Sequence, residues 1–307
     1  MLNFNIFPRA LIVLSLMVGQ AYAQDVTSTL SYDPEGLNND LSLQMLTAKT
    51  RTVSDENVAD AKSSDYYSQG YFGHNYGSGF MNLSAHTEAD GFMNSLVNLH
   101  LGGVASASSV WHTSFVNGLA PMSYSMNIDI INGFVRLGGW TSSTGGRNMQ
   151  GGFFADVSAN GVSVWNSSQT LVLTGLDASI TQTGYDIGHG AISYVPKTDN
   201  SEQEAEYTSN AFFGAINLGS FAAGQAIDVT YTLTSFARWE DPHGCAYECG
   251  YVIAGIEDPL SISGGGNNVP RITANVTSVP EPETYAMFLA GLGVMGAVAL
   301  RRKAKQA

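Results

Sequence analysis

The chain has 307 residues, and its 26 Asp and Glu outnumber its 13 Lys and Arg, so the formal net charge is −13. This charge argues against a nucleic-acid-binding surface, which needs a basic footprint, and against docking on anionic lipid. Charged residues make up only 13% of the chain, too few for a fold built mainly of amphipathic helices, whereas 44% hydrophobic residues can form a buried core. The 2 cysteines cannot form a disulfide-dense scaffold.

Residues 1–23 are typical of a secretory signal peptide. Arg9 is the only charged residue of this segment, and an apolar run follows it over residues 10–18. Ala21 and Ala23 then form the A-x-A pattern that a signal peptidase recognises, so we expect cleavage after Ala23. The apolar run is too short to anchor the chain in a membrane, because a spanning helix needs about 20 residues.

Residues 24–266 are predicted to form one all-β ectodomain, an antiparallel β-sandwich that is jelly-roll-like. Its first part, residues 24–68, is polar and less regular. We expect an N-terminal strand, a long loop and one short helix over residues 55–62 in this part. Helices are not expected between the later strands, which excludes a βαβ enzyme fold.

Alternation of apolar and polar residues predicts the strands of the ectodomain. The positions expected to be buried are Trp111, Thr113 and Phe115; Tyr124, Met126, Ile128 and Ile130; and Ile227, Val229, Tyr231 and Leu233. Further strands are expected over 134–137, 153–157, 170–174, 251–256 and 271–276. Asn132-Gly133 and Asn160-Gly161 are dipeptides typical of two-residue hairpin turns, so we expect a tight turn at each.

Aromatic residues alternate with glycines between residues 66 and 80. Exposed aromatic rings can stack on the apolar faces of sugar rings, which makes Tyr71 and Tyr76 candidate glycan contacts in a flexible loop. The alternative is that half of these rings are core residues of edge strands.

Three glutamates, Glu202, Glu204 and Glu206, occupy alternate positions. On a strand they would share one face and repel one another, so we expect a solvated loop. A calcium site is the alternative, since hard cations take several carboxylates.

The two cysteines, Cys245 and Cys249, lie four residues apart in a chain expected to be exported, so we predict a structural disulfide between them. A zinc site with Asp241 and His243 would need a fourth ligand at fixed geometry. We therefore predict no metal and no cofactor.

A catalytic site is not readable from the sequence. Ser163 and Ser193 lie outside any G-x-S-x-G pattern, and no nucleophile with a neighbouring base can be nominated. The chain is therefore expected not to be an enzyme.

The carboxyl end has three parts after an expected linker over residues 267–278. Val279, Pro280, Glu281 and Pro282 begin a stiff, extended stretch, because proline disfavours a helix in the residue before it. Residues 285–300 carry no charge and are expected to form one short transmembrane helix. Arg301, Arg302 and Lys303 begin a basic tail, residues 301–307, which the positive-inside rule keeps in the cytoplasm.

This order of parts over residues 279–303 resembles the PEP-CTERM sorting domain. The resemblance implies recognition by an exosortase of Gram-negative bacteria and cleavage near Pro280–Pro282. It also implies transient anchoring in the inner membrane and delivery to the cell surface or the exopolysaccharide matrix. Val279 to Pro282 would then be substrate residues and not catalytic ones.

The function expected from these features is that of a surface or biofilm-matrix protein with a structural or adhesive role. Its expected partners are signal peptidase and, transiently, the exosortase, with exopolysaccharide as a candidate and nucleic acid excluded. The alternatives are a carbohydrate-binding module and a secreted glycan hydrolase.

Overall fold

The structure of the chain is a computed structural model. It describes residues 23–33, 49–55, 58–71, 74–88, 92–100, 103–140, 148–175, 177–185, 187, 191–195, 202–240, 250–259, 272–275, 290 and 295. From Ala23 to Asn275 all elements of the described part are β-strands, and neighbouring strands pair antiparallel. The prediction of an all-β, antiparallel fold is therefore confirmed.

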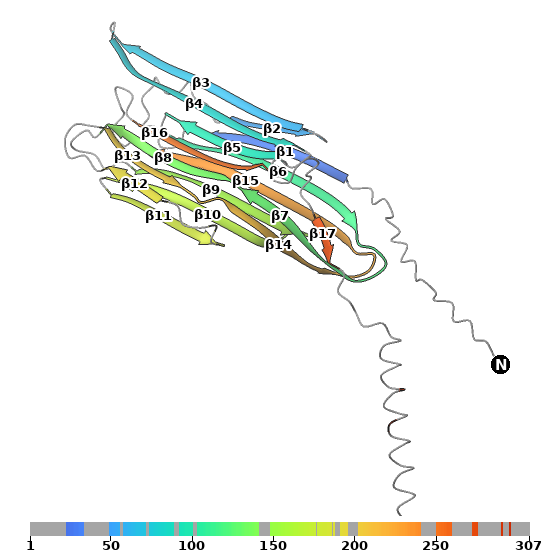
Figure 1. The fold of residues 1–307 in the computed structure, drawn as a ribbon. Helices are drawn as coiled ribbons and strands as arrows, with labels where there is room; N and C mark the ends of the chain where they lie inside the picture. The colour runs from blue at the N-terminus through green and yellow to red at the C-terminus, as the bar shows by residue number, and fades with distance from the viewer. Residues whose placement is uncertain are drawn as a thin grey trace, which may run out of the picture.

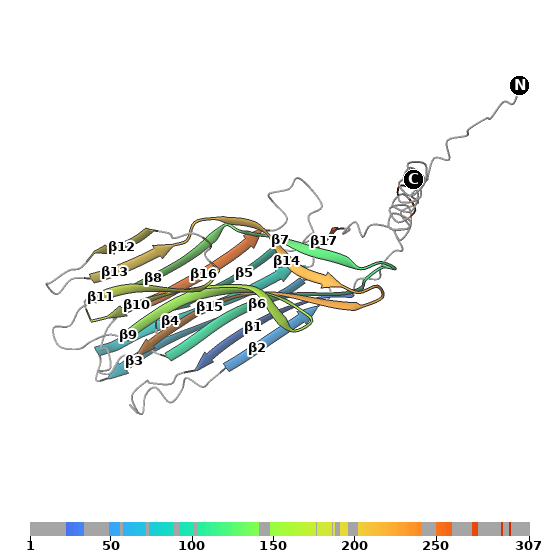
Figure 2. The same ribbon diagram turned by 90° about the horizontal axis from the view of Figure 1, so that it is seen from below.

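The described strands form three sheets, which we call A, B and C (Figures 1 and 2). Sheet A has the order β11 (Asp177–Gly184), β10 (Val162–Thr174), β9 (Asn148–Ala159), β15 (Ala226–Glu240), β6 (Gly103–Val116), β1 (Ala23–Asp33) and β2 (Lys49–Asp55). Sheet B has the order β12 (Ala191–Val195), β13 (Glu202–Thr208), β8 (Asn132–Trp140), β16 (Tyr251–Pro259), β5 (Phe92–Leu99), β4 (His74–Glu88) and β3 (Val58–Tyr71). Sheet C is smaller, with the order β14 (Phe212–Phe221), β7 (Met122–Ile130) and β17 (Ile272–Asn275).

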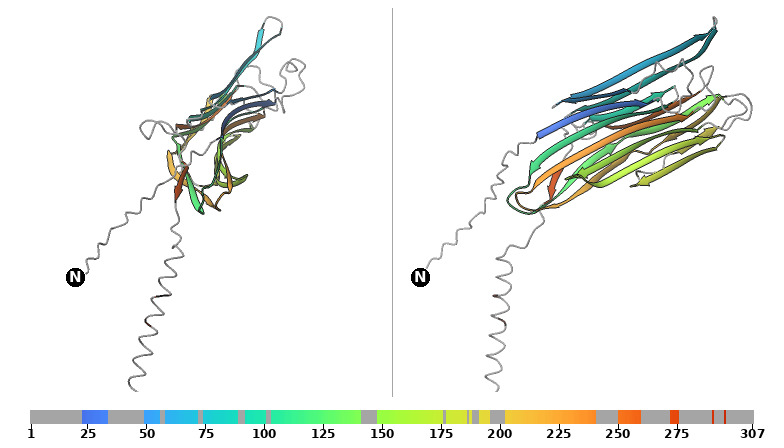
Figure 3. Two further views of the ribbon diagram at one scale, coloured as in Figure 1. Left: turned by 90° about the vertical axis from the view of Figure 1, so that its right-hand side faces the viewer. Right: turned by 180° about the vertical axis from the view of Figure 1, so that it is seen from behind.

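Sheets A and B pack face to face (Figure 3, left). Strands β6, β15 and β9 of sheet A lie over β5, β16 and β8 of sheet B. The inward side chains of both sheets form one core, whose largest fully buried members include Trp111, Tyr32, Tyr207, Tyr231 and Phe153. This arrangement leaves the other face of each sheet for outward side chains.

The alternation read from the sequence matches the burial of the strands. Trp111, Thr113 and Phe115 of β6 are at most 4% exposed. The buried positions of β7, from Tyr124 to Ile130, and of β15, from Ile227 to Leu233, also match the prediction. The period-two pattern is therefore reliable here wherever the buried residues are large and apolar.

The prediction of a helix over residues 55–62 is wrong, because β2 ends and β3 begins in this segment. Ala59 and Ala61 of β3 are fully buried, while Asp60 and Lys62 point outward, so the period is that of a strand. The region 24–68 contains β1, β2 and most of β3, which is more regular than expected. The buried residues of β3 are small, as at Ala59 and Ala61, which hides the pattern there, whereas β1 buries Val26, Leu30 and Tyr32.

The two Asn-Gly dipeptides behave differently. Asn160-Gly161 makes the expected turn between β9 and β10, with φ angles of 50° and 75°. The hairpin predicted at Asn132-Gly133 is wrong, because β7 belongs to sheet C and β8 to sheet B. Glycine is required at position 133 for a different reason: the ring of Phe153 packs so close that a Cβ at this position would lie 2.6 Å from it.

The segment 267–278, expected to be a linker, contains β17, which pairs with β7. At the other end, β1 begins at Ala23, and its next residue, Gln24, pairs with Thr113. The described part of the chain contains no helix with the length and apolar character needed to cross a bilayer. Apart from Ala290 and Met295, the expected span 285–300 lies outside the described residues.

Candidate functional site

Several predicted site residues lie outside the described residues. These are Ala21, Cys245, Cys249, Asp241, His243, Val279 to Pro282, and Arg301 to Lys303. Tyr71 and Tyr76 are placed by their backbone in the hairpin of β3 and β4, where a flexible loop had been expected. Their role in glycan binding remains a prediction.

The loop predicted for the three glutamates is wrong, because they lie in β13. Arg136 of the neighbouring strand β8 holds two of them: its Nε lies 3.1 Å from Glu204 Oε1, and its Nη2 donates to Glu206 Oε1 at 3.2 Å. The hydrogen bond that Arg136 donates to Glu206 raises the pKa of Arg136, burial lowers it, and the negative charges of both glutamates raise it further. The positive charge of Arg136 therefore offsets the repulsion between the glutamates, which is why they can occupy one face of a strand.

We expect Arg136→Gln to lower the free energy of unfolding by about 0.5–1 kcal/mol at low salt, because the ion pairs are exposed to solvent. The loss should shrink in 1 M salt, where the Debye length is about 3 Å. Urea unfolding at both salt concentrations measures this. Arg136→Lys is the control that retains the charge, and a salt-independent loss would show that Arg136 acts through packing.

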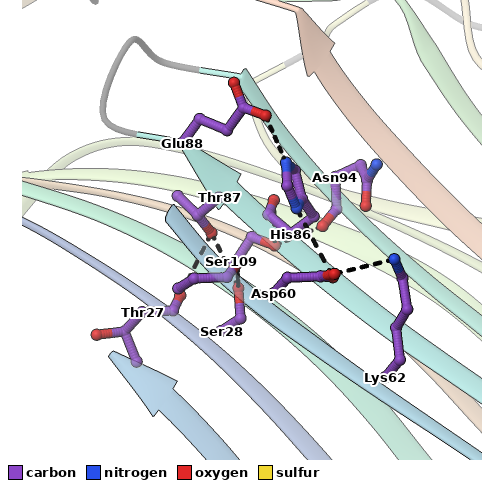
Figure 4. A network of polar contacts seen from close by, with 10 residues as sticks. Thr27, Ser28, Asp60, Lys62, His86, Thr87, Glu88, Asn94 and Ser109 are labelled. Atoms are coloured by element: carbon purple, nitrogen blue, oxygen red, sulfur yellow. Dashed lines mark hydrogen bonds and ion pairs between the residues drawn. The ribbon is translucent and has the colours of Figure 1, made fainter. Parts of the chain in front are cut away.

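A polar network joins β3 and β4 (Figure 4). The His86 ring lies between two carboxylates, with Nε2 2.8 Å from Glu88 Oε1 and Nδ1 3.7 Å from Asp60 Oδ1. Lys62 Nζ lies 2.9 Å from Asp60 Oδ2, so Asp60 also forms an ion pair within its own strand. Below it, Ser109 Oγ donates to the carbonyl oxygens of His86 and Asn94, which ties the network to sheet A.

A buried carboxylate joins all three sheets. Asp258 of β16 is 0% exposed, and its Oδ2 accepts bonds from Tyr231 Oη of β15 at 2.6 Å and from the backbone N–H of Asp129 of β7 at 3.1 Å. Burial, followed by the charge of Asp258, raises the pKa of Tyr231 well above its ordinary value, and desolvation raises the pKa of Asp129. The phenol is therefore protonated at neutral pH and donates its hydrogen bond there, which suits a structural role at this junction.

The described residues include no group of His, Cys, Asp and Glu that could hold a metal ion. Ser163 of β10 donates to Asp156 Oδ1 at 2.5 Å, and Ser193 lies in β12.

Hydroxyl side chains form two rows on the outward face of sheet A. The strand registers place one row across all seven strands, formed by Thr52, Thr29, Ser108, Thr234, Phe154, Ser168 and Thr183. A parallel row contains Ser31, Ser106, Phe236, Gly152, Thr170 and Thr181. We call these two rows the hydroxyl face. Neither row contains a charged residue.

Hydrogen bonds between strands hold the hydroxyl groups of this face in place. Ser108 Oγ lies 2.9 Å from Thr234 Oγ1, and Thr29 Oγ1 lies 3.2 Å from Thr52 Oγ1. Sequence analysis missed this surface. The sequence signal for it is the occurrence of Ser and Thr at alternate positions of β6, β10 and β15. The sequence analysis treated these residues only as the polar, outward positions of each strand.

A model of the PEP-CTERM protein-sorting motif matches residues 278–303. The match covers the Pro-Glu-Pro stretch and the residues from Arg301 to Lys303, so the chain carries this sorting motif, as predicted. The motif implies export, membrane-anchored transit and processing by an exosortase. It begins at Ser278, three positions after β17 ends at Asn275.

No curated protein sequence matches the chain. The membrane-inserted NetB toxin of Clostridium perfringens is 9% identical over 71% of this chain and 94% of the toxin chain, with a TM-score of 0.12. A structure of the infectious bursal disease virus Gx strain is 10% identical over 78% of this chain and 64% of its own chain, with a TM-score of 0.10. Scores this low support no argument about fold or function.

Proposed function

We propose that the mature chain is a surface or extracellular-matrix protein in which the paired β-sheets have a structural or adhesive binding role. The observation that carries this proposal is the sorting motif at residues 278–303, which directs an exported chain to an exosortase. In the proposed pathway, signal peptidase cleaves after Ala23, residues 285–300 hold the chain in the inner membrane, and the exosortase then releases it.

The structure supports this pathway at both ends of the folded body. Strand β1 begins at Ala23, where the first cleavage is expected, and β17 ends three positions before the motif. Because β17 pairs with β7, the segment that leads to the motif is bound to the folded body. Cleavage at the motif would therefore leave sheets A, B and C complete.

A binding role in the matrix is supported by the shape of the body. Two seven-stranded sheets present broad outward faces, and the face of sheet A carries rows of hydroxyl groups. Such a surface offers many weak contacts to a polymer. The carbohydrate-binding alternative is favoured by the same face.

The test is to fractionate producing cells and to compare them with cells that lack the chain. We expect the mature protein in the surface and matrix fractions, and a matrix that disperses under lower shear when the chain is deleted. Recovery of the protein only from the periplasm would contradict the proposal. Release of reducing sugar from the matrix polymer by the purified protein would favour the glycan hydrolase instead.

A further inference from the structure

Two aromatic side chains lie near the centre of the hydroxyl face. Phe236 of β15 is paired with Gly152 of β9, and Phe154 of β9 is paired with Thr234 of β15. Both rings are half-buried on the outward side of the sheet. They occupy diagonal positions on neighbouring strands, about 7–8 Å apart, which is within reach of a common ligand.

The ring of Phe236 leans across the neighbouring strand. A Cβ on Gly152 would lie 2.5 Å from Phe236 Cζ and 2.7 Å from Cε1, so glycine is what lets the ring cover this position. Gly152 is buried although it faces outward, because the ring covers it. The tip of the Phe236 ring therefore lies over Gly152, and the side chain remains partly exposed on the outward side of the sheet.

Hydroxyl groups surround this ring. Ser106 lies opposite Phe236 on β6, and Thr170 lies opposite Gly152 on β10. Thr234, two residues before Phe236 on the same strand face, is held by Ser108 at 2.9 Å. A hydroxyl group has one donor and two acceptor sites, so a group bonded to its neighbour can still bond a ligand.

The charge of the protein restricts the ligand. The two rows of the hydroxyl face contain no charged residue, Arg238 and Asp156 lie in the rows on either side of them, and the whole chain carries a net charge of −13. An anionic polymer would be repelled by the net charge and would find the single cation Arg238 beside these rows, with Asp156 on their other side. A neutral sugar chain has apolar C–H faces for the ring and hydroxyl groups for the flanking Ser and Thr.

We propose that the hydroxyl face binds a neutral polysaccharide chain, with one sugar ring stacked on Phe236. Ser106, Thr170 and Thr234 bond the hydroxyl groups of that sugar and its neighbours, and Phe154 contacts the next sugar. The inference rests on the proposed function, because it names the class of matrix polymer that the body binds.

The experiment is affinity electrophoresis of the mature protein in gels that contain hydroxyethylcellulose, laminarin or alginate. We expect retardation by at least one of the two neutral polymers and none by anionic alginate. Phe236→Thr should weaken the retarding interaction about two- to tenfold, which is what the loss of one aromatic contact of about 0.5–1.5 kcal/mol amounts to. Phe213→Thr is the matched control, since Phe213 is 61% exposed but lies on β14 of sheet C.

Circular dichroism and the thermal midpoint establish whether each variant is folded. Should Phe236→Thr unfold, Thr170→Val removes a flanking hydroxyl while retaining a β-branched shape, and it should weaken binding to the same polymer. Equal retardation of the wild type and a folded variant of this set would overturn the proposal.

Lack of retardation by both neutral polymers would also overturn it, as would arrest of ice growth without retardation, since regular hydroxyl rows could instead order water. These failures differ from failure of the proposed function, which would appear as loss of the protein from the surface and matrix fractions.

Discussion

Replacing Pro280, Glu281 and Pro282 together by alanine is expected to retain nearly all of the protein in the inner membrane and to remove it from the surface and the culture fluid. The sequence predicts that the two prolines disfavour helix and sheet pairing in this segment, because proline cannot continue a helix or donate in a sheet. A processing enzyme needs an accessible backbone, whereas alanine would favour a helix in the segment. Immunoblots of membrane, surface and culture fractions measure the distribution.

The matched control is Glu283→Gln, which removes a neighbouring charge and leaves all three motif residues in place. It should be released as the wild type is. Mass spectrometry of released protein should find a carboxyl end near residues 280–282, and it also tests the Cys245–Cys249 bond. Release of the triple variant at the wild-type level, or a released chain that still ends at Ala307, would contradict exosortase processing.

The strands of the body could be predicted from local sequence because their buried residues are large. In β15, Ile227, Val229, Tyr231 and Leu233 alternate with polar residues, and all four are fully buried. The same reading failed in β3, where the buried residues are alanines. A small buried side chain gives a weak periodic signal, although the strand is held by its hydrogen-bonded neighbour β4.

Partners distant in sequence explain the remaining errors. Glu204 and Glu206 repel one another in isolation, but Arg136 comes from a strand that is about seventy residues earlier and is paired by register. Asn132-Gly133 has the composition of a turn, yet glycine is required at 133 because a Cβ there would collide with the ring of Phe153. Local propensity cannot show either partner.

The sorting motif and the hydroxyl face also differ in how far they can be predicted from local sequence. The sorting motif consists of consecutive residues within 278–303, so it could be predicted from the sequence alone. The hydroxyl face joins Ser108 to Thr234 across 126 positions, and only the sheet registers reveal it.

The second large effect on stability is expected from a substitution at the junction of Tyr231, Asp258 and Asp129. One oxygen of the buried Asp258 accepts both the phenol of Tyr231 and the N–H of Asp129, so strands of sheets A, B and C meet at one atom. Hydrogen bonds to a carboxylate contribute about 1.5–3 kcal/mol, and a buried acceptor that loses its donor also suffers its desolvation penalty. The effect of removing the phenol should therefore exceed that of removing an exposed ion pair.

Tyr231→Phe is expected to lower the free energy of unfolding by about 2–3 kcal/mol at pH 7, a fall of about 5–10 °C in the thermal midpoint. In a double-mutant cycle with Asp258→Asn, which retains an acceptor oxygen, the two changes should couple by about 1 kcal/mol or more.

Because folding raises the pKa of Tyr231, the contribution of its phenol to stability is present below the ordinary pKa of 10.0 and is lost as the pH rises above that value. The wild type and Tyr231→Phe should therefore converge in stability above pH 10. Additive effects in the cycle, or a gap between the two proteins that does not narrow at alkaline pH, would show that the phenol stabilises the junction by packing alone.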